Sequence, residues 1–421
     1  MNFSKNWAIV ILLLVGYSIW YFSYNFTRGI VPSSSTGTGY ILESSKIQEA
    51  YTYLEKYYYS FSDKTPEERE DALIDALTKS LWDKHTSYFN PKDAEEFVES
   101  LSWDFEGIGA VIQEHPKGIQ IMKVLDNSPA KKSNLIKWDV ILKINTTSTI
   151  GMLAEDAVEI IRGPKWSTIT LTILSGTTER EVKIERDHVI VPSVQGDFLS
   201  GSTIGYIEVG FFGENTTQEF TRTLESLLES GAEGIIIDGR NNWGWYLDSS
   251  VDILSTILPD NQLVVATRGI RPSENMDYKT QKRKIQNTQI PIIMVVNSMS
   301  ASATEIVAGA LQDYDRAIIV GEKTYGKWSV QEPFILSDGS MMKITVAKWF
   351  TPKDRWIDEK WIEPDVSIDL TDDDYKNIYD RQLEWARVLL QDIIENQSKI
   401  SEYKKDTEKI DTLLQEKKIY E

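Results

Sequence analysis

A cluster of serines follows an apolar run in the second half of the chain. Residues 290–297 read IPIIMVVN, and Ser298, Ser300 and Ser302 come next, where a helical pattern begins that extends to Gln312. A serine at the N-terminus of a helix lies near backbone N–H groups and the positive end of the helix dipole, which would stabilise an oxyanion during acyl transfer. Alternatively, these serines only cap the helix.

A serine nucleophile needs a base, and no histidine occurs where strands and helices alternate, between residues 203 and 366. A lysine would therefore have to serve, since burial can lower its pKa towards ~7. Lys323 and Lys327 both follow the next apolar strand, in the segment GEKTYGK. From these residues alone either lysine is a candidate base, and either could instead be an ordinary surface lysine.

Longer motifs around these residues resemble the carboxyl-terminal processing (tail-specific) peptidases, a family of serine endopeptidases. The resemblance covers residues 44–370. The matching segments are SASATEIVAGALQDY (300–314), VGEKTYGKxSVQ (320–331), FEGIGA (105–110), DxRNNxG (238–244) and IEPDV (362–366).

The resemblance implies a role for several residues. Ser302 would be the nucleophile, Lys327 the base, and Gln331 would orient the lysine. The amide of Ala303 would form half of the oxyanion hole, and the turn at Gly244 and Trp245 the other half. No metal or cofactor would be needed.

A PDZ-like domain is also implied, over residues 98–190. Its loop Gly107-Ile108-Gly109-Ala110 would hold the terminal carboxylate of a substrate on backbone N–H groups, while an edge strand pairs with the substrate's extended tail. The alternative is that this segment is an ordinary turn. The sequence DNSPAKKSNL that follows it also resembles the family, which favours the binding loop. Arg162, in IRGPK, could couple tail binding to the active site.

The patterning predicts the elements that position these groups. Helical spacing runs through residues 43–97, where Thr65-Pro66-Glu67-Glu68 is typical of a helix start. Short β-type runs follow in 98–190, and strands alternate with helices in 191–370. A helical tail, 371–421, carries one apolar face, which would pack against the core or against a second copy in a homo-oligomer.

At the start of the chain, residues 7–22 form an apolar run behind Lys5, with no small-x-small cleavage site after it. We therefore expect a transmembrane signal anchor over residues 1–25, a linker over 26–42, and a catalytic part on the extracytoplasmic side. A buried core helix is the alternative.

Composition excludes other classes of function. With 64 acidic against 45 basic residues the net charge is −19, which disfavours binding to nucleic acid. The chain has no cysteine, so it has no thiolate nucleophile and no cysteine-based metal site. His85, His115 and His188 show no metal-ligand spacing.

Tryptophan occupies positions where the family pattern expects glycine, in turns that flank strands. The eight positions are Trp82, Trp103, Trp138, Trp166, Trp243, Trp245, Trp328 and Trp361, and Trp356 is a further candidate. The chain has 24 glycines in 421 residues, below the average usage of about 7%. We hypothesise that the gene reads UGA as glycine, so that the natural protein has glycine at these positions.

The sequence therefore predicts an α/β protease core, similar to crotonase and Clp by family resemblance, with an inserted β-rich PDZ-like domain. Helical segments would flank it, behind an N-terminal transmembrane anchor. Its partners would be polypeptides with free C-terminal tails. The rival interpretation is a catalytically inactive peptide-binding scaffold, in which tryptophans fill the cleft.

Overall fold

The computed structural model describes residues 45–102, 104–282, 289–356, 361–371 and 379–404, together with residues 285, 374 and 412. These residues form two compact units, one of residues 45–95 and 331–346, the other of residues 96–330 and from 347 onward. The expected anchor, the linker and Trp103 lie outside the described residues. Within the described ranges, no helix has both the length and the apolar character to cross a bilayer.

The first unit is mainly helical. From the first part of the chain it contains α2 (Ser45–Tyr57), the 3₁₀ turn η2 (Phe61–Asp63), α3 (Pro66–Lys79), β1 (Ser87–Phe89) and the beginning of α4 (Pro91–Ser102). Helix α3 begins where the sequence predicts: the Thr65 hydroxyl accepts the N–H of Glu68, and the Glu68 carboxylate accepts the N–H of Thr65. This reciprocal pair is a capping box.

An antiparallel sheet forms the centre of the β-rich segment, with the order β3-β4-β5-β7-β8. Its strands are β3 (Ala110–His115), β4 (Gly118–Val124), β5 (Val140–Ile144), β7 (Thr168–Ser175) and β8 (Thr178–Glu185). The remaining elements are β2 (Asp104–Gly107), paired with β9 (Asp187–Ile190), β6 (Thr147–Ser148), α5 (Pro129–Lys132) and α6 (Ala154–Ile161). Alternate residues of β7 are buried, as one-sided burial of a strand requires.

The α/β core contains a six-stranded sheet in the order β10-β11-β12-β15-β16-β19. The strands are β10 (Val194–Phe198), β11 (Ile204–Val209), β12 (Gly234–Asp238), β15 (Ile292–Val296), β16 (Ile318–Gly321) and β19 (Val366–Ser367). Only β10 runs antiparallel to its neighbour. Every residue of β12 and β15 is buried, because helices cover both faces of the sheet.

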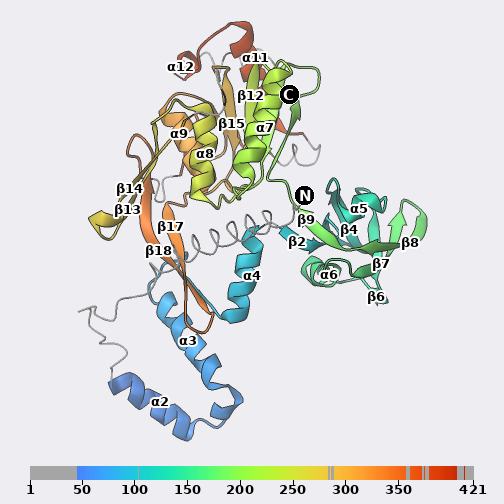
Figure 1. Cartoon of the computed structure of the whole chain (residues 1–421), viewed down its shortest axis with the longest axis vertical. Coiled ribbons are helices and arrows are strands. Elements are labelled where there is room, and N and C mark those ends of the chain that lie inside the picture. The colour runs from blue at the N-terminus through green and yellow to red at the C-terminus, as the bar shows by residue number, and fades with distance from the viewer. Residues whose placement is uncertain are drawn as a thin grey trace, which may run out of the picture. The chain divides into compact units, whose positions relative to one another are not determined.

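Helices α7 (Thr216–Glu229), α8 (Leu247–Ile257) and α9 (Ala303–Asp313) pack on one face, and α11 (Arg381–Glu395) packs on the other (Figure 1). Along β12, Ile235 and Ile237 face the first layer and Ile236 faces α11. The apolar stripe of the tail is buried on the sheet through Ala386, Leu389, Leu390 and Ile393. The short helix α12 (Ile400–Tyr403) follows.

Two hairpins were absent from the expected elements. One joins β13 (Leu263–Gly269) to β14 (Met276–Lys279) around η3 (Pro272–Glu274), and the other joins β17 (Ser329–Ile335) to β18 (Met341–Phe350). Strand β17 contains Pro333 and shows no regular alternation of burial. Local pattern therefore gives little indication of the pairing.

Candidate active site

Ser302 lies between β15 and α9, at the residue immediately before the helix. Its φ of 56° and ψ of −116° fall outside the regions that non-glycine residues ordinarily occupy. A nucleophilic serine on a sharp turn between strand and helix carries strain of this kind. Ala303 is the first helical residue, so its N–H has no acceptor within the helix.

Gly244 lies directly against Ser302. A Cβ atom on Gly244 would be 2.8 Å from the Cβ of Ser302, 2.7 Å from the N of Ala303 and 2.6 Å from the O of Ala301. These separations are shorter than real Cβ contacts, and the φ of +90° also favours glycine. The turn can approach the serine this closely only because residue 244 has no side chain.

Asn242, which is fully buried, fixes this turn. Its side chain donates to the O of Val209 (2.7 Å) and accepts the N–H of Gly244 (2.8 Å). Its carbonyl accepts the N–H of Ala301 and the hydroxyl of Thr304, both at 2.9 Å. The N–H of Gly244 thus already has an acceptor in Asn242. The oxyanion roles expected for the turn at Gly244 and Trp245 stay predictions.

The two candidate lysines differ in their surroundings. The side chain of Lys323 is exposed, with its Nζ 3.0 Å from a carboxylate oxygen of Glu363 and 4.7 Å from the ring centre of Trp361. Lys327 is partly buried, and its backbone N–H donates to the Oε2 of Glu305 (2.9 Å). Of the two, Lys327 is the one whose backbone is tied to the helix that follows Ser302.

Glu305 joins the serine segment to the lysine segment and was not among the expected site residues. Its side chain is completely buried. The Oε2 accepts the N–H groups of Ser302 (2.8 Å) and Lys327 (2.9 Å). The Oε1 accepts the N–H of Gly326 (2.7 Å) and the hydroxyl of Thr324 (2.5 Å). Glutamate three residues after Ser302 has the spacing of a capping box, which is the signal that could have identified it.

Burial raises the pKa of Glu305, and the hydrogen bonds from Thr324, Gly326, Ser302 and Lys327 oppose that rise. All four groups donate to the carboxylate, so protein donors occupy it fully. In the part of the chain that the structure describes, no three His, Asp or Glu side chains are placed to hold a metal ion.

Gln331 belongs to the first unit, on β17. Its Nε2 donates to the hydroxyl of Thr345 on β18, at 3.3 Å. The N–H of Thr345 donates in turn to the hydroxyl of Thr86 (3.1 Å). The role of Gln331 in orienting Lys327 stays a prediction.

The loop expected to bind a carboxylate is held by two backbone hydrogen bonds. The carbonyl of Ile108 accepts the N–H of Ala130 (2.7 Å), and the carbonyl of Gly109 accepts the N–H of Leu125 (3.0 Å). Gly109 has a φ of +76°, and a Cβ there would lie 2.4 Å from the Cβ of Ser128. Residue 109 must therefore be glycine, whatever the loop binds.

Arg162 is exposed and follows the last residue of α6. A different arginine binds the C-terminal end of that helix. Arg186 is buried, and it donates hydrogen bonds to the carbonyls of Ile161 (2.8 Å) and Ile160 (3.0 Å). The coupling role expected for Arg162 stays a prediction.

Of the eight tryptophans at expected glycine positions, the structure describes seven, and five of these have a positive φ. They are Trp82 (56°), Trp138 (78°), Trp166 (70°), Trp245 (117°) and Trp361 (33°). Within the described part of the chain, nine other non-glycine residues have a positive φ, and seven of them are Asn or Asp, the types that tolerate this region. Trp243, Trp328 and Trp356 have ordinary φ values, and they pack against Tyr325 or against each other.

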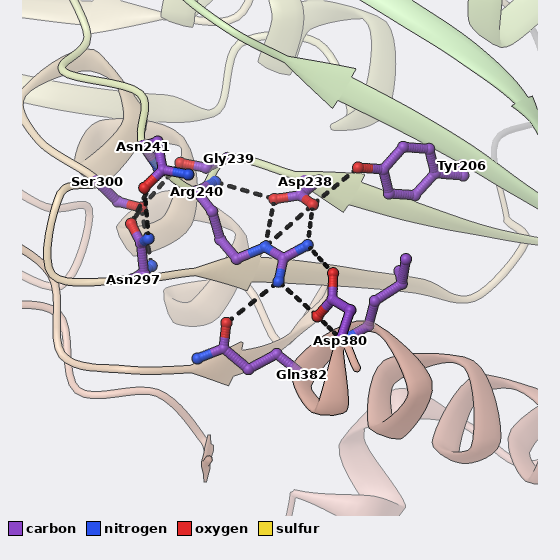
Figure 2. A network of polar contacts seen from close by, with 10 residues as sticks. Tyr206, Asp238, Gly239, Arg240, Asn241, Asn297, Ser300, Asp380 and Gln382 are labelled. Carbon is purple, nitrogen blue, oxygen red and sulfur yellow. Dashed lines mark hydrogen bonds and ion pairs between the residues drawn. The ribbon is translucent and has the colours of Figure 1, made fainter. Parts of the chain in front are cut away.

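A buried polar network is built on Arg240, two residues before Asn242 (Figure 2). Its guanidinium donates to both oxygens of Asp238, to both oxygens of Asp380 and to the Oε1 of Gln382. Asp238 also accepts the hydroxyl of Tyr206 (2.8 Å). The sequence did not predict this network, because Asp380 is 140 residues away in the chain.

Comparisons with known proteins agree with this architecture. The model of "Peptidase family S41" matches residues 203–368, and the PDZ domain model matches residues 104–174. A solved structure from Bacteroides fragilis, described as an S41 protease, has a TM-score of 0.52 and 18% identity, covering 79% of this chain and 90% of its own. At this identity the likeness shows the fold alone.

Two curated relatives show the similarity in sequence. The "Probable CtpA-like serine protease" of Staphylococcus epidermidis is 33% identical over 77% of this chain and 65% of its own length. The "Carboxy-terminal processing protease CtpA" of Bacillus subtilis is 32% identical over 81% of this chain and 71% of its own length. The chain spans 65% of the length of the first relative and 71% of the length of the second. It belongs to peptidase family S41, among the carboxy-terminal processing serine proteases.

Proposed function

We propose that the chain is a serine endopeptidase that recognises the C-terminal tail of a polypeptide and cleaves the polypeptide through an acyl-enzyme. Ser302 is the nucleophile, Lys327 the general base, and Gln331 orients the lysine. The oxyanion donors are the N–H of Ala303 and the turn at Gly244 and Trp245. Family membership and the geometry around Ser302 support this proposal.

One observation carries the proposal. Ser302 and Lys327 are 25 residues apart in the sequence, yet their backbone N–H groups donate to the same oxygen of the buried Glu305. The strained backbone of Ser302 and the side-chain-free contact with Gly244 are expected where a reacting carbonyl must reach both the nucleophile and the backbone donors.

In the proposed reaction, the hydroxyl of Ser302 attacks the scissile carbonyl while neutral Lys327 accepts its proton. The developing oxyanion is stabilised by the N–H of Ala303 at the positive end of α9. Lys327 then gives the proton to the leaving amine. Water attacks the acyl-enzyme as the same lysine accepts its proton, and that proton passes to the oxygen of Ser302 when the ester bond breaks.

We further propose that the PDZ domain holds the substrate's free carboxylate on the loop from Gly107 to Ala110, and that Arg162 links tail binding to cleavage. The matching PDZ model supports peptide binding by this part of the chain. The apolar N-terminal run would anchor the enzyme in the cell membrane, with its catalytic part outside the cytoplasm.

The test uses the full chain, made as written and with glycine at the eight tryptophan positions, acting on an unstructured polypeptide with an apolar tail. We expect Ser302→Ala and Lys327→Ala each to lower kcat by roughly 10⁴-fold or more, because nucleophile and base act as a unit. Lys323→Ala is the matched control and should leave kcat close to unchanged.

A folded Ser302→Ala protein with substantial turnover would overturn the assignment. If neither form of the chain cleaves the polypeptide while both bind it, the chain is the inactive scaffold. We expect the glycine form to be the active one, since tryptophan at 245 strains the proposed oxyanion turn and Trp328 adjoins the base.

A further inference from the structure

The network around Arg240 lies between the C-terminal helix and two segments of the proposed catalytic site. We propose that Asp380 and Gln382, at the start of α11, are positioning residues for catalysis. Through Arg240 and Glu322 they would hold the turn beside Ser302 and the segment that carries Lys327 in one fixed relation. This inference rests on the proposed peptidase function.

Arg240 connects α11 to the turn. Its side chain is only 13% exposed, and it forms ion pairs with Asp238 at the end of β12 (2.6 Å) and with Asp380, the N-cap of α11 (2.7 Å). The residues that follow it are fixed as well: the N–H of Asn241 donates to the side chain of Asn297 (2.9 Å). Figure 2 shows these groups side by side. A shift of the guanidinium would therefore be transmitted to Asn242 and Gly244.

Gln382 connects the same helix to the base segment. Its side chain is completely buried. The Nε2 donates to the Oε1 of Glu322 (3.1 Å) and to the carbonyl of Ile368 (2.8 Å), while the Oε1 accepts from Arg240 (3.2 Å). The chemistry fixes this orientation, because a flipped amide would direct its NH₂ group at the guanidinium. Glu322 is near the start of the segment that leads to Lys327, and its N–H donates to the O of Val296 at the end of β15 (3.0 Å).

Both segments therefore meet the first turn of one helix. The paired carboxylates and the buried amide leave the guanidinium little freedom, because every bond in the cluster is charge-assisted or buried. Small displacements of catalytic groups have large kinetic effects, about 100-fold for a shift of 1 Å. Loosening the cluster should accordingly lower the rate of acylation rather than weaken substrate binding.

The experiment measures kcat, KM and the rate at which a fluorophosphonate probe labels Ser302, in whichever form of the full chain is active. Asp380→Asn removes the charge from a partly exposed side chain, and Gln382→Leu removes both amide contacts. We expect kcat and the labelling rate to fall by roughly 10- to 100-fold in each, with KM nearly unchanged. Asp380→Glu keeps the carboxylate and should retain more activity than Asp380→Asn.

The matched control is Glu384→Gln, which breaks the pair with Arg387 on the same helix without touching Arg240. It should keep wild-type kinetics. If Asp380→Asn lowers the unfolding temperature while kcat and the labelling rate per folded molecule stay at wild-type values, the residues are structural only and the inference fails. If the parent chain neither cleaves peptide nor is labelled at Ser302, the proposed function fails instead.

Discussion

Among the described tryptophans, some are buried in the core, and others are exposed at a backbone φ that favours glycine. Trp349 and Trp385 are 1% and 3% exposed and belong to the core. Trp138 and Trp166 are 56% and 67% exposed, with φ values that favour glycine. The second kind gains little from burial and carries backbone strain of about 1–3 kcal/mol each.

We therefore expect Trp138→Gly and Trp166→Gly each to raise the free energy of unfolding by about 0.5–1 kcal/mol, the relief of strain less the entropy that glycine adds to the unfolded chain. Chemical denaturation measures this change. Trp385→Ala is the control and should lower the free energy of unfolding by about 3–5 kcal/mol, because it leaves a cavity in the core.

Losses as large as that of the control at positions 138 and 166 would show that the tryptophans belong there. The codons give an independent answer. UGA at the eight positions supports glycine in the natural protein, whereas UGG would contradict the recoding hypothesis and favour the inactive scaffold.

At the scale of single residues, the sequence offers candidates where a motif is continuous, and it misses groups whose partners are distant in the chain. Ser302 and Lys327 could be chosen because their segments resemble a family signature. Glu305 could have been found from its capping-box spacing, but its bond to Lys327 could not, because it depends on how two segments pack. The cluster of Arg240 with Asp380 and Gln382 has no local pattern at all.

Helix α11 shows how one element can depend on a few polar contacts at its start. Asp380 caps it, accepting the N–H of Leu383 at 3.0 Å, and also pairs with Arg240. Burial by itself would raise the pKa of Asp380, but the hydrogen bonds and charge of Arg240 lower it below its ordinary value. The pair therefore stabilises the fold at pH values above about 4, the ordinary pKa of aspartate.

As the pH falls through the lowered pKa, protonation of Asp380 should remove this stabilisation. We predict that the wild-type chain loses more stability between about pH 5 and 2 than Asp380→Asn does, and that the variant is the less stable of the two at pH 7. Urea unfolding at several pH values measures both effects. Parallel acid curves for the two proteins would refute the role assigned to this pair, and Glu384→Gln serves as the control on the same helix.

The elements themselves were largely predictable, because their periodicities are strong. The buried strands β12 and β15 read as continuous apolar runs, and α11 shows a clear apolar stripe. The hairpins β13–β14 and β17–β18 were not predicted, since their pairing is set by contacts along the hairpin and with distant strands rather than by alternation.

At the scale of the whole molecule, we propose that a domain which binds the substrate's tail acts together with a catalytic core. If the loop from Gly107 to Ala110 holds a terminal carboxylate, then amidating the C-terminus of a substrate should lower kcat/KM by roughly 10- to 100-fold, since a charged group loses its hydrogen bonds. Steady-state cleavage of matched free-acid and amidated peptides measures this. A matched change away from the tail, amidation of an internal glutamate side chain, should have little effect.

Equal cleavage of the free-acid and amidated peptides would show that the enzyme does not recognise the tail by its charge. In that case the PDZ domain would have to select substrates through strand pairing and side-chain pockets alone.

The unequal burial of the tryptophans has an optical consequence. Indoles in water emit at longer wavelengths than indoles in an apolar core, so the exposed side chains at 82, 138 and 166 should dominate the red edge of the emission spectrum. A chain with glycine there should emit at shorter wavelength and be quenched less by iodide, because buried indoles such as Trp349 and Trp385 contribute a larger share of its emission. The wavelength of the intrinsic fluorescence would thus show whether the turns of the natural protein contain tryptophan or glycine.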